Sequence, residues 1–153
     1  MTRILMVCLG NICRSPLAEG ILQSKTDSNS VFVDSAGTAG FHVGNPPDKR
    51  SIDIAKKYGI DISNQKCRKF SKSDFNKFDC IYVMDYSNYE NVIALTEHDI
   101  QKQKVKLLLT EGTSNNHEVP DPYYGGIQGF DNAFRLIDNA CDNIAHKLTK
   151  DES

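Results

Sequence analysis

Residues 4–19 read Ile-Leu-Met-Val-Cys-Leu-Gly-Asn-Ile-Cys-Arg-Ser-Pro-Leu-Ala-Glu, and this segment is the most informative of the chain. Its four apolar residues at the start predict a buried strand, and the residues from Pro16 onward predict a helix. Between them lie the thiol of Cys8 and, after five further residues, the guanidinium of Arg14 and the hydroxyl of Ser15. Backbone N–H groups at a helix N-terminus point at a bound anion, and the same field favours the reactive thiolate form of cysteine. The stretch therefore predicts an anion-binding loop with Cys8 as a nucleophile at its floor.

The other residues of this loop favour the nucleophile over the alternative, in which Cys8 is a small apolar residue that ends a strand. Gly10 and Asn11 are residue types that tolerate the left-handed backbone conformation of a tight loop. Ser15 and Pro16 fit the N-cap and the first position of the following helix. We therefore expect a loop shaped for phosphate chemistry.

Apolar runs alternate with helical patterns along the rest of the chain. The runs that predict further buried strands are residues 31–33, 80–84 and 105–109, and the helical patterns cover about residues 16–25, 49–58, 87–96 and 130–148. Alternating strands and helices predict a parallel sheet with right-handed crossovers and helices on both faces. Ligands bind such sheets at the carboxyl ends of the strands, which is where Cys8 falls.

Composition narrows the possible functions. The length of 153 residues is typical of one domain, and we expect a single domain over residues 1–153 with the last few residues disordered. The net charge of -2 gives no electrostatic footprint for nucleic acid, and no apolar run is long enough for membrane insertion. Five cysteines is an odd number, so reduced thiols and a cytoplasmic location are expected. Cysteine and histidine spacings do not match those of metal ligands, so neither a metal nor a cofactor is expected.

A second segment with chemical potential, residues 118–126, reads Glu-Val-Pro-Asp-Pro-Tyr-Tyr-Gly-Gly. Alone it is ordinary turn chemistry, so a plain loop is the alternative interpretation. Pro122 biases Asp121 toward an extended backbone, and the two tyrosines can wall an aromatic substrate. The segment lies between the fourth predicted strand and the last helix, so we expect Asp121 over the same sheet edge as Cys8.

Together the two segments resemble the low-molecular-weight protein tyrosine phosphatase family, and the resemblance extends over essentially the whole chain. The stretches that carry it are residues 7–19 (VCLGNICRSPLAE), 34–38 (DSAGT), 44–48 (GNPPD), 84–88 (MDYSN) and 121–125 (DPYYG). The resemblance implies a single three-layer, flavodoxin-like α/β domain with a four-stranded parallel sheet between helices. It implies an enzyme that hydrolyses phosphotyrosine in proteins through a cysteinyl-phosphate intermediate. A monomer is the default expectation for such a chain.

The resemblance also assigns roles in catalysis. Cys8 is expected to be the nucleophile, Asp121 the general acid, and Arg14 the residue whose guanidinium holds phosphate oxygens. The backbone amides expected to bind the phosphate belong to Leu9, Gly10, Asn11, Ile12, Cys13 and Arg14. Ser15 is expected to donate a hydrogen bond to the Cys8 sulfur, and N-capping of the helix is its alternative role.

Further residues are expected to support this site. Asn11 and Ser35 resemble family positions that brace the loop by hydrogen bonds. The side chains expected to form apolar walls around a substrate ring, and so to favour phosphotyrosine over phosphoserine, are Leu9, Phe41, Tyr123 and Tyr124. Cys13 lies five positions from Cys8 and is expected to form a reversible disulfide with it under peroxide, with simple packing beneath the loop as the alternative.

One departure from the family concerns the bracing network. Members often have a histidine there, a few residues before Arg68, whereas this chain has Asn64 and Gln65. We expect one of these two amides to replace the histidine.

Three other functions remain as alternatives. A thiol-dependent arsenate reductase shares the fold and loop but needs two further cysteines, typically starting near Cys80, and no thiol follows there through Tyr89. A phosphoarginine phosphatase tends to have threonine at the position of Ile12 and one aromatic residue in place of the tyrosine pair at 123 and 124. An inactive phosphate-binding module is the third alternative, and the intact catalytic set described above argues against it.

Overall fold

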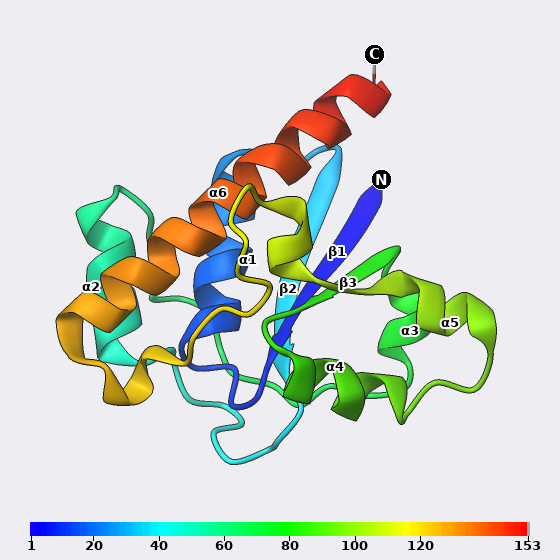
Figure 1. Cartoon of the computed structure of the whole chain (residues 1–153), viewed down its shortest axis with the longest axis horizontal. Helices are drawn as coiled ribbons and strands as arrows, with labels where there is room; N and C mark the ends of the chain where they lie inside the picture. Colours follow the sequence, from blue (N-terminus) through cyan, green and yellow to red (C-terminus); the bar gives the residue numbers. More distant parts are fainter. Residues whose placement is uncertain (153) are drawn as a thin grey trace.

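The computed structural model describes the backbone of residues 1–152 and the side chains of residues 1–149, except that of residue 124. Four parallel strands form one sheet in the order β2-β1-β3-β4 (Figure 1). Their bounds are Thr2–Cys8 for β1, Val31–Gly37 for β2, Cys80–Val83 for β3 and Val105–Leu107 for β4. The expected four-stranded parallel sheet is therefore confirmed. Its strand order switches direction between β1 and β3, next to the strand that ends at Cys8.

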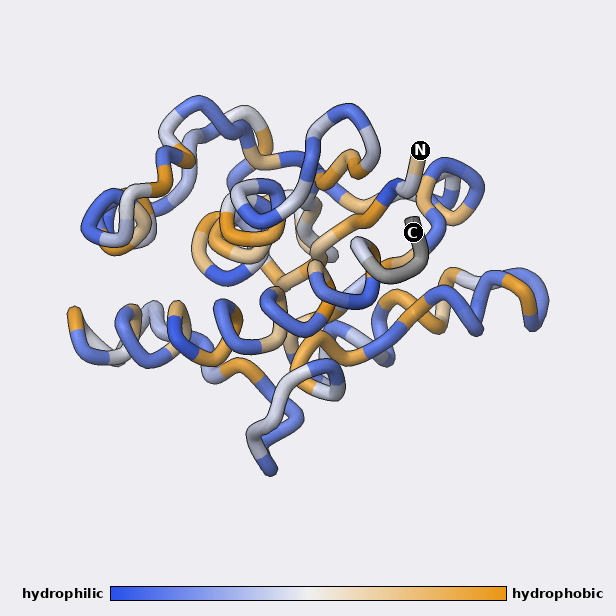
Figure 2. The backbone as a smooth tube through the Cα atoms, turned by 90° about the horizontal axis from the view of Figure 1, so that it is seen from above, coloured by the Kyte–Doolittle hydropathy of each residue, from blue (hydrophilic) through white to orange (hydrophobic). Residues whose placement is uncertain are grey.

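Helices cover both faces of this sheet. The elements α1 (Arg14–Ser24), α2 (Lys49–Lys57) and α6 (Gly126–Glu152) lie on one side, and α3 (Asp74–Lys77), α4 (Tyr86–Ile93) and α5 (Asp99–Lys104) lie on the other (Figure 1). Successive residues of β1 alternate between two apolar cores: Met6 and Cys8 belong to the core with α1 and α6, and Leu5 and Val7 belong to the core with α3 and α4. Figure 2 shows apolar segments gathered toward the middle of the molecule and hydrophilic turns outside. The expected three-layer α/β arrangement is thus confirmed.

Helix α1 begins two residues earlier than the sequence predicts. Its N-cap is Cys13, whose side chain makes no capping hydrogen bond, so the prediction that Ser15 caps this helix is wrong. Ser15 instead lies in the first turn, where its hydroxyl faces the loop that precedes the helix. Pro16 is the third residue of α1, still within the first turn, where a missing N–H costs no helical hydrogen bond.

Short elements are missing from the sequence prediction. Helices α3 and α5 have four and six residues, and the 3₁₀ turn η1 (Leu108–Glu111) replaces the end of the predicted fourth strand. A second 3₁₀ turn, η2 (Pro122–Tyr124), follows Asp121 directly. Elements of less than two turns contain too little hydrophobic periodicity to be recognised from a pattern.

The last helix is longer than the apolar stripe that predicts it. Its backbone is helical from Gly126 to Glu152, and residue 153 lies outside the described residues. Within the part of the chain that the structure describes, no helix combines the length and the apolar character needed to cross a membrane.

Candidate active site

The loop that follows β1 lies at the carboxyl edge of the sheet. Cys8 pairs with Gly37 at the end of β2, and the backbone N–H of Thr38 donates to the carbonyl of Cys8 at 2.9 Å. A Cβ atom at Gly37 would lie 2.8 Å from the carbonyl oxygen of Leu9 and 3.1 Å from the backbone nitrogen of Asn11. Only glycine therefore allows β2 to approach the loop this closely.

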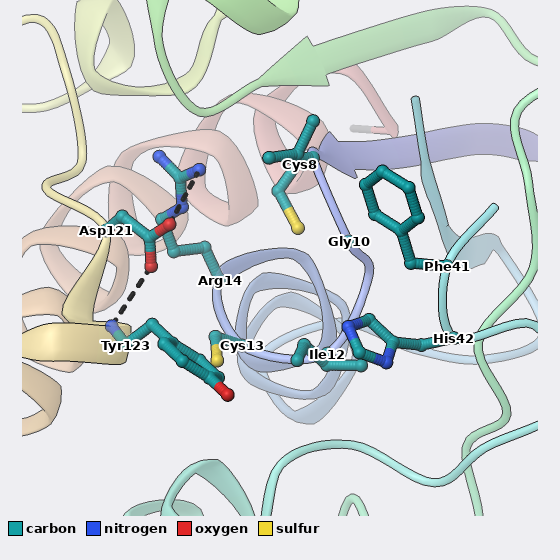
Figure 3. A pocket seen from close by; sticks show the side chains of 10 residues that line it. Cys8, Gly10, Ile12, Cys13, Arg14, Phe41, His42, Asp121 and Tyr123 are labelled. Carbon is teal, nitrogen blue, oxygen red and sulfur yellow. Dashed lines mark hydrogen bonds and ion pairs between the residues drawn. The ribbon is translucent and has the colours of Figure 1, made fainter. Parts of the chain in front are cut away.

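The Cys8 sulfur faces the inside of the loop, and the residue is only 3% exposed (Figure 3). The backbone N–H of Asn11 donates to this sulfur at 3.2 Å, and Oγ of Ser15 lies 3.0 Å from it. Nδ2 of Asn11 donates to the same Ser15 oxygen at 2.8 Å, and the hydroxyl hydrogen of Ser15 is free to be donated to a thiolate at Cys8. Two donors thus converge on Sγ, an arrangement that stabilises a thiolate.

Asn11 is the centre of the network that holds the loop. Its φ of 56° is left-handed, whereas Gly10 has no positive φ. Its side-chain nitrogen also donates to Oγ of Ser35 at 3.0 Å, and its side-chain oxygen accepts from the backbone N–H of Arg68 at 2.9 Å. The thiol of Cys67 donates to its backbone oxygen at 2.7 Å. All four polar groups of Asn11 have partners, so protein contacts alone determine the shape of the loop.

The network continues from Asn11 to a carboxyl group. The hydroxyl of Ser35 donates to Oε1 of Glu19 at 2.7 Å. Burial raises the pKa of Glu19 to about 7, against the opposing effect of the Ser35 hydrogen bond; the charge of Asp34 raises it further and that of Arg68 lowers it. A carboxyl group that changes its charge near neutral pH is therefore connected to the Cys8 sulfur by four hydrogen bonds. The path runs through the side chains of Ser15, Asn11 and Ser35.

The two amides expected to replace the family's histidine have other surroundings. Nε2 of Gln65 donates to the backbone oxygen of Pro16 at 3.1 Å, and its buried Oε1 has no partner among the described residues. Among the residues that the structure describes, neither Asn64 nor Gln65 is hydrogen-bonded to Asn11. The residues that hold Asn11 from this side are Cys67 and Arg68, two and three positions after Gln65.

Arg14 is buried in the first turn of α1, with 4% of its side chain exposed. Its Nη1 donates to Oδ2 of Asp85 at 2.7 Å and to the backbone oxygen of Val119 at 2.9 Å. Burial lowers the pKa of Arg14, but the charges of Cys8 and Asp85 raise it by more, so the guanidinium remains charged. The contacts with Asp85 and Val119 fix one terminal nitrogen and leave the other directed toward the loop mouth.

Asp121 reaches this mouth from the far end of the sequence. Its Oδ2 lies 4.0 Å from Nη2 of Arg14, and its side chain is 48% exposed. Its Oδ1 accepts a hydrogen bond from the backbone N–H of Tyr123 at 3.0 Å and so caps η2 (Figure 3). The cap fixes the carboxylate in position while half of it stays open to solvent.

A cavity of about 300 Å³ joins these groups. The residues that line it are Cys8, Leu9, Gly10, Ile12, Cys13, Arg14, Phe41, His42, Asp121 and Tyr123. Phe41 and Tyr123 stand on opposite sides of it, as wall residues should (Figure 3). Of the predicted site residues, Ser15, Asn11 and Ser35 do not line this cavity, and the side chain of Tyr124 lies outside the described residues.

The N-terminus of α2 connects the Cys8 loop to the Asp121 segment. The backbone N–H of Asp48 donates to the carbonyl of Ile12 at 2.8 Å, and the Asp48 carboxylate binds Arg50 through two hydrogen bonds of 3.0 Å. Nη1 of Arg50 then donates to the carbonyl of Tyr123 at 2.7 Å. The Arg50 guanidinium carbon also lies 4.9 Å from the ring centroid of Tyr123 and 4.7 Å from that of Phe130. Asp48 and Arg50 thus hold the Cys8 loop and the Asp121 segment in a fixed position relative to each other.

Cys13 shares the cavity with Cys8 and is a free thiol. Both sulfur atoms face the cavity (Figure 3). Burial raises the pKa of Cys13 to about 12, with a further contribution from the negative charges of Asp48 and Cys8. Cys13 is therefore a protonated thiol near neutral pH.

Several functional residues are absent from the sequence prediction. They are Glu19, His42, Asp48, Arg50, Cys67 and Asp85, all of which contact the loop, its network or the Asp121 segment. Asp85 lies in one of the stretches that resemble the family, and its position before a helix is the signal that could have found it. Among the described residues, no group of three or more His, Cys, Asp or Glu side chains is arranged to hold a metal ion.

The fold and the loop together define a class of enzyme. A flavodoxin-like sheet presents a buried thiol inside a turn of backbone amides, and an arginine and a carboxyl group lie at its mouth. Chemistry of this kind belongs to the cysteine-based hydrolases of phosphoric monoesters.

Comparison with known proteins gives the family. The family described as low molecular weight phosphotyrosine protein phosphatase matches residues 3–153. A protein of that name from Schizosaccharomyces pombe is 40% identical over 147 residues, which cover 89% of this chain and 90% of the relative. The crystal structure of a protein tyrosine phosphatase from Entamoeba histolytica, with Hepes in its active site, matches all of both chains with a TM-score of 0.93 and 35% identity. Wzb of Vibrio vulnificus, in complex with benzylphosphonate, matches 95% of this chain and 98% of its own, with a TM-score of 0.84 and 31% identity.

The chain belongs to the low molecular weight phosphotyrosine protein phosphatase family. It is a protein tyrosine phosphatase that hydrolyses phosphotyrosine by a cysteine-based mechanism, and its substrates are phosphoproteins.

Proposed function

We propose that Cys8 is the nucleophile of this phosphatase and that residues 9–14 form its phosphate cradle. The Cys8 thiolate attacks phosphorus in line, an S–P bond forms, and the bond from phosphorus to the phenolic oxygen breaks. The observation that supports this most directly is the convergence of the Asn11 N–H and the Ser15 hydroxyl on the Cys8 sulfur, at 3.2 and 3.0 Å. Both donors favour the thiolate before attack and its departure from the phosphoenzyme afterwards.

Arg14 and the backbone amides of the cradle hold the three non-bridging oxygens. A guanidinium donates to phosphate through two parallel N–H groups, and Asp85 fixes the plane of this one. Positioning and charge stabilisation account for most of the rate enhancement in phosphoryl transfer. The contacts of Asn11 with Ser35 and Arg68 matter for that reason, since they keep the cradle rigid.

Asp121 is the general acid in the first step and the general base in the second. It protonates the departing phenolic oxygen and then takes a proton from the water that hydrolyses the phosphoenzyme. Its position 4.0 Å from Arg14, the proposed phosphate ligand, supports this role. The cap on η2 holds it there.

The walls of the cavity select an aryl phosphate. Leu9, Phe41 and Tyr123 line the route to the sulfur, and aromatic side chains contact a phenyl ring favourably by stacking. Benzylphosphonate, which binds Wzb of Vibrio vulnificus, likewise has an aromatic ring beside a phosphoryl group. This supports phosphotyrosine over phosphoarginine as the substrate.

Cys13 protects the nucleophile from over-oxidation. Peroxide oxidises the Cys8 thiolate to a sulfenic acid, and the Cys13 thiol attacks its sulfur, forming a Cys8–Cys13 disulfide and releasing water. The two thiols line the same cavity, which supports this step.

We also propose that residues 1–153 form one phosphatase domain that acts as a monomer in the cytoplasm, where its five free thiols stay reduced.

Steady-state hydrolysis of three matched peptides tests the specificity and the nucleophile. The peptides contain phosphotyrosine, phosphoserine or phosphoarginine in the same surroundings, and the wild-type chain is compared with Cys8→Ser. We expect turnover of the phosphotyrosine peptide only, its loss in Cys8→Ser, and retention of phosphate binding by that variant. Equal turnover of phosphoarginine, or residual turnover by Cys8→Ser near the wild-type rate, would contradict the proposal.

A further inference from the structure

A second, smaller groove lies between α2 and the start of α6. It has a volume of about 290 Å³, and its lining residues are Arg50, Asp53, Ile54, Lys57, Ile127 and Phe130. Ile54 and Phe130 are buried and form its floor, whereas Ile127 is 81% exposed at its rim. A large apolar side chain that is exposed beside an apolar floor marks a surface suited to a partner's side chain.

Arg50 lies between the groove and the active site. The Arg50 guanidinium contacts the ring of Tyr123, which lines the catalytic cavity, and the ring of Phe130, which lines the groove. Because its central carbon lies within 5 Å of both ring centroids, the two rings are no more than roughly 10 Å apart, the span of about three extended residues. A protein segment whose phosphotyrosine enters the cavity therefore reaches the groove within a few residues.

The two cations that line the groove already have carboxylate partners in the protein. Arg50 is bound to the carboxylate of Asp48, and Nζ of Lys57 lies 3.8 Å from Asp131. A basic groove that recognised acidic residues would instead offer cations without such carboxylates. What the groove offers a ligand is mainly apolar, with Ile127 exposed above the buried Ile54 and Phe130, so an apolar side chain fits it best.

We propose that this groove binds an apolar side chain of the substrate protein, located two to four residues from the phosphotyrosine. The proposal rests on the function proposed above, since it requires the phosphotyrosine ring to lie against Tyr123. We call the surface formed by Ile54, Ile127 and Phe130 the Ile127 groove. This groove then helps to determine which phosphoproteins are dephosphorylated. Small aryl phosphates do not reach it, so their turnover is independent of Ile127.

The test uses Ile127→Ser, with Ile100→Ser as a matched control. Both isoleucines are highly exposed, at 81% and 67%, so neither substitution disturbs the core, and Ile100 lies on α5 on the opposite side of the sheet. The substrates are p-nitrophenyl phosphate and phosphotyrosine peptides with leucine, alanine or aspartate at each of the second to fourth positions on either side.

We expect the wild-type chain and Ile100→Ser to favour leucine over alanine about tenfold in kcat/KM at one of these positions. In Ile127→Ser the preference should fall close to one, with p-nitrophenyl phosphate turnover unchanged. An equal preference in all three chains, or none in the wild type, overturns the proposal. So does sedimentation that shows a dimer for the wild type and a monomer for Ile127→Ser, because the groove would then be an interface between copies. Loss of p-nitrophenyl phosphate turnover by the wild type would instead count against the proposed function.

Discussion

Oδ2 of Asp85 lies 2.7 Å from Nη1 of Arg14, and this ion pair joins the N-terminus of α4 to the first turn of α1. Asp85 and the Val119 carbonyl hold Nη1 of Arg14, so removal of the carboxylate lets the guanidinium turn away from the geometry that binds phosphate in two parallel hydrogen bonds. Asp85→Ala should therefore weaken inhibition by inorganic phosphate by about 10- to 100-fold, the equivalent of one charged hydrogen bond. Asp85→Asn keeps an acceptor and should weaken it less. An unchanged inhibition constant in both variants would show that Asp85 does not orient Arg14.

Removal of the Asp121 carboxyl group should slow the cleavage of aryl phosphates by about 10²–10⁴-fold. The loss should be largest for substrates with weakly acidic phenols, because these leaving groups depend most on a proton. Measurement of kcat for Asp121→Ala across a series of aryl phosphates checks this. If the variant matched the wild type on the poorest leaving groups, another residue would be the acid.

Glu19 should make the stability of the fold depend on pH. Its pKa of about 7 in the folded chain exceeds the ordinary value of 4.5, so the folded state holds a proton that the unfolded state has lost between these values. The stabilising contribution is fully present below about pH 4.5 and is lost as the pH rises through 7, by on the order of 3 kcal/mol at most. Glu19→Gln is neutral throughout and should remove this loss.

Urea unfolding of the two chains between pH 5 and pH 8 measures the effect. The midpoint of Glu19→Gln should exceed that of the wild type by an increasing margin as the pH rises. Parallel pH dependences for the two chains would contradict the raised pKa of Glu19.

Loss of Arg50 should release the segment that contains Asp121. Arg50→Ala removes the hydrogen bond to the Tyr123 carbonyl and the contacts with two rings, and misplacement of a catalytic group by about 1 Å costs up to 10²-fold in rate. We expect kcat on aryl phosphates to fall about tenfold, and vanadate affinity to change little, because Cys8 and Arg14 stay in place. Arg135→Ala, an exposed arginine of α6, is the control and should retain full activity. An active Arg50→Ala would show that the cap on η2 suffices.

The Cys13→Ser variant should turn over substrate like the wild type but recover poorly from peroxide. Cys13, with its pKa of about 12, is itself protonated and unreactive toward peroxide, so it acts only after Cys8 is oxidised. Activity regained with dithiothreitol after a peroxide pulse measures the protection. Cys80→Ser is the matched control, and equal recovery of all three chains would remove Cys13 from this role.

The sequence predicts those parts of the site that are contiguous. The spacing from Cys8 to Ser15 and the isolated Asp121 between prolines are visible in a single stretch each, and parallel topology brings the two together. The partners of these residues are distant in sequence: Asp85 lies 71 positions from Arg14, and Arg50 lies 73 positions from Tyr123. Such contacts depend on packing between layers, which residue types and their periodicity do not specify.

Ser15 shows how tertiary structure overrides a local signal. A serine before a proline at the start of a helix predicts an N-cap, and that expectation holds for an isolated helix. Here the Cys8 sulfur and the Asn11 amide take the hydroxyl instead, and the helix begins at Arg14 without a side-chain cap. A helix that begins beside a thiol without a side-chain cap thus indicates that its serine serves the thiol.

The complete set of partners around Asn11 has a further consequence for the reaction. A cradle whose shape is built in advance offers bare orthophosphate nearly every contact that it offers the ester, because the aryl ring touches only the walls. The product is therefore a competitor for the empty enzyme, and the concentration of orthophosphate around it sets how much of this phosphatase is free to meet its next substrate.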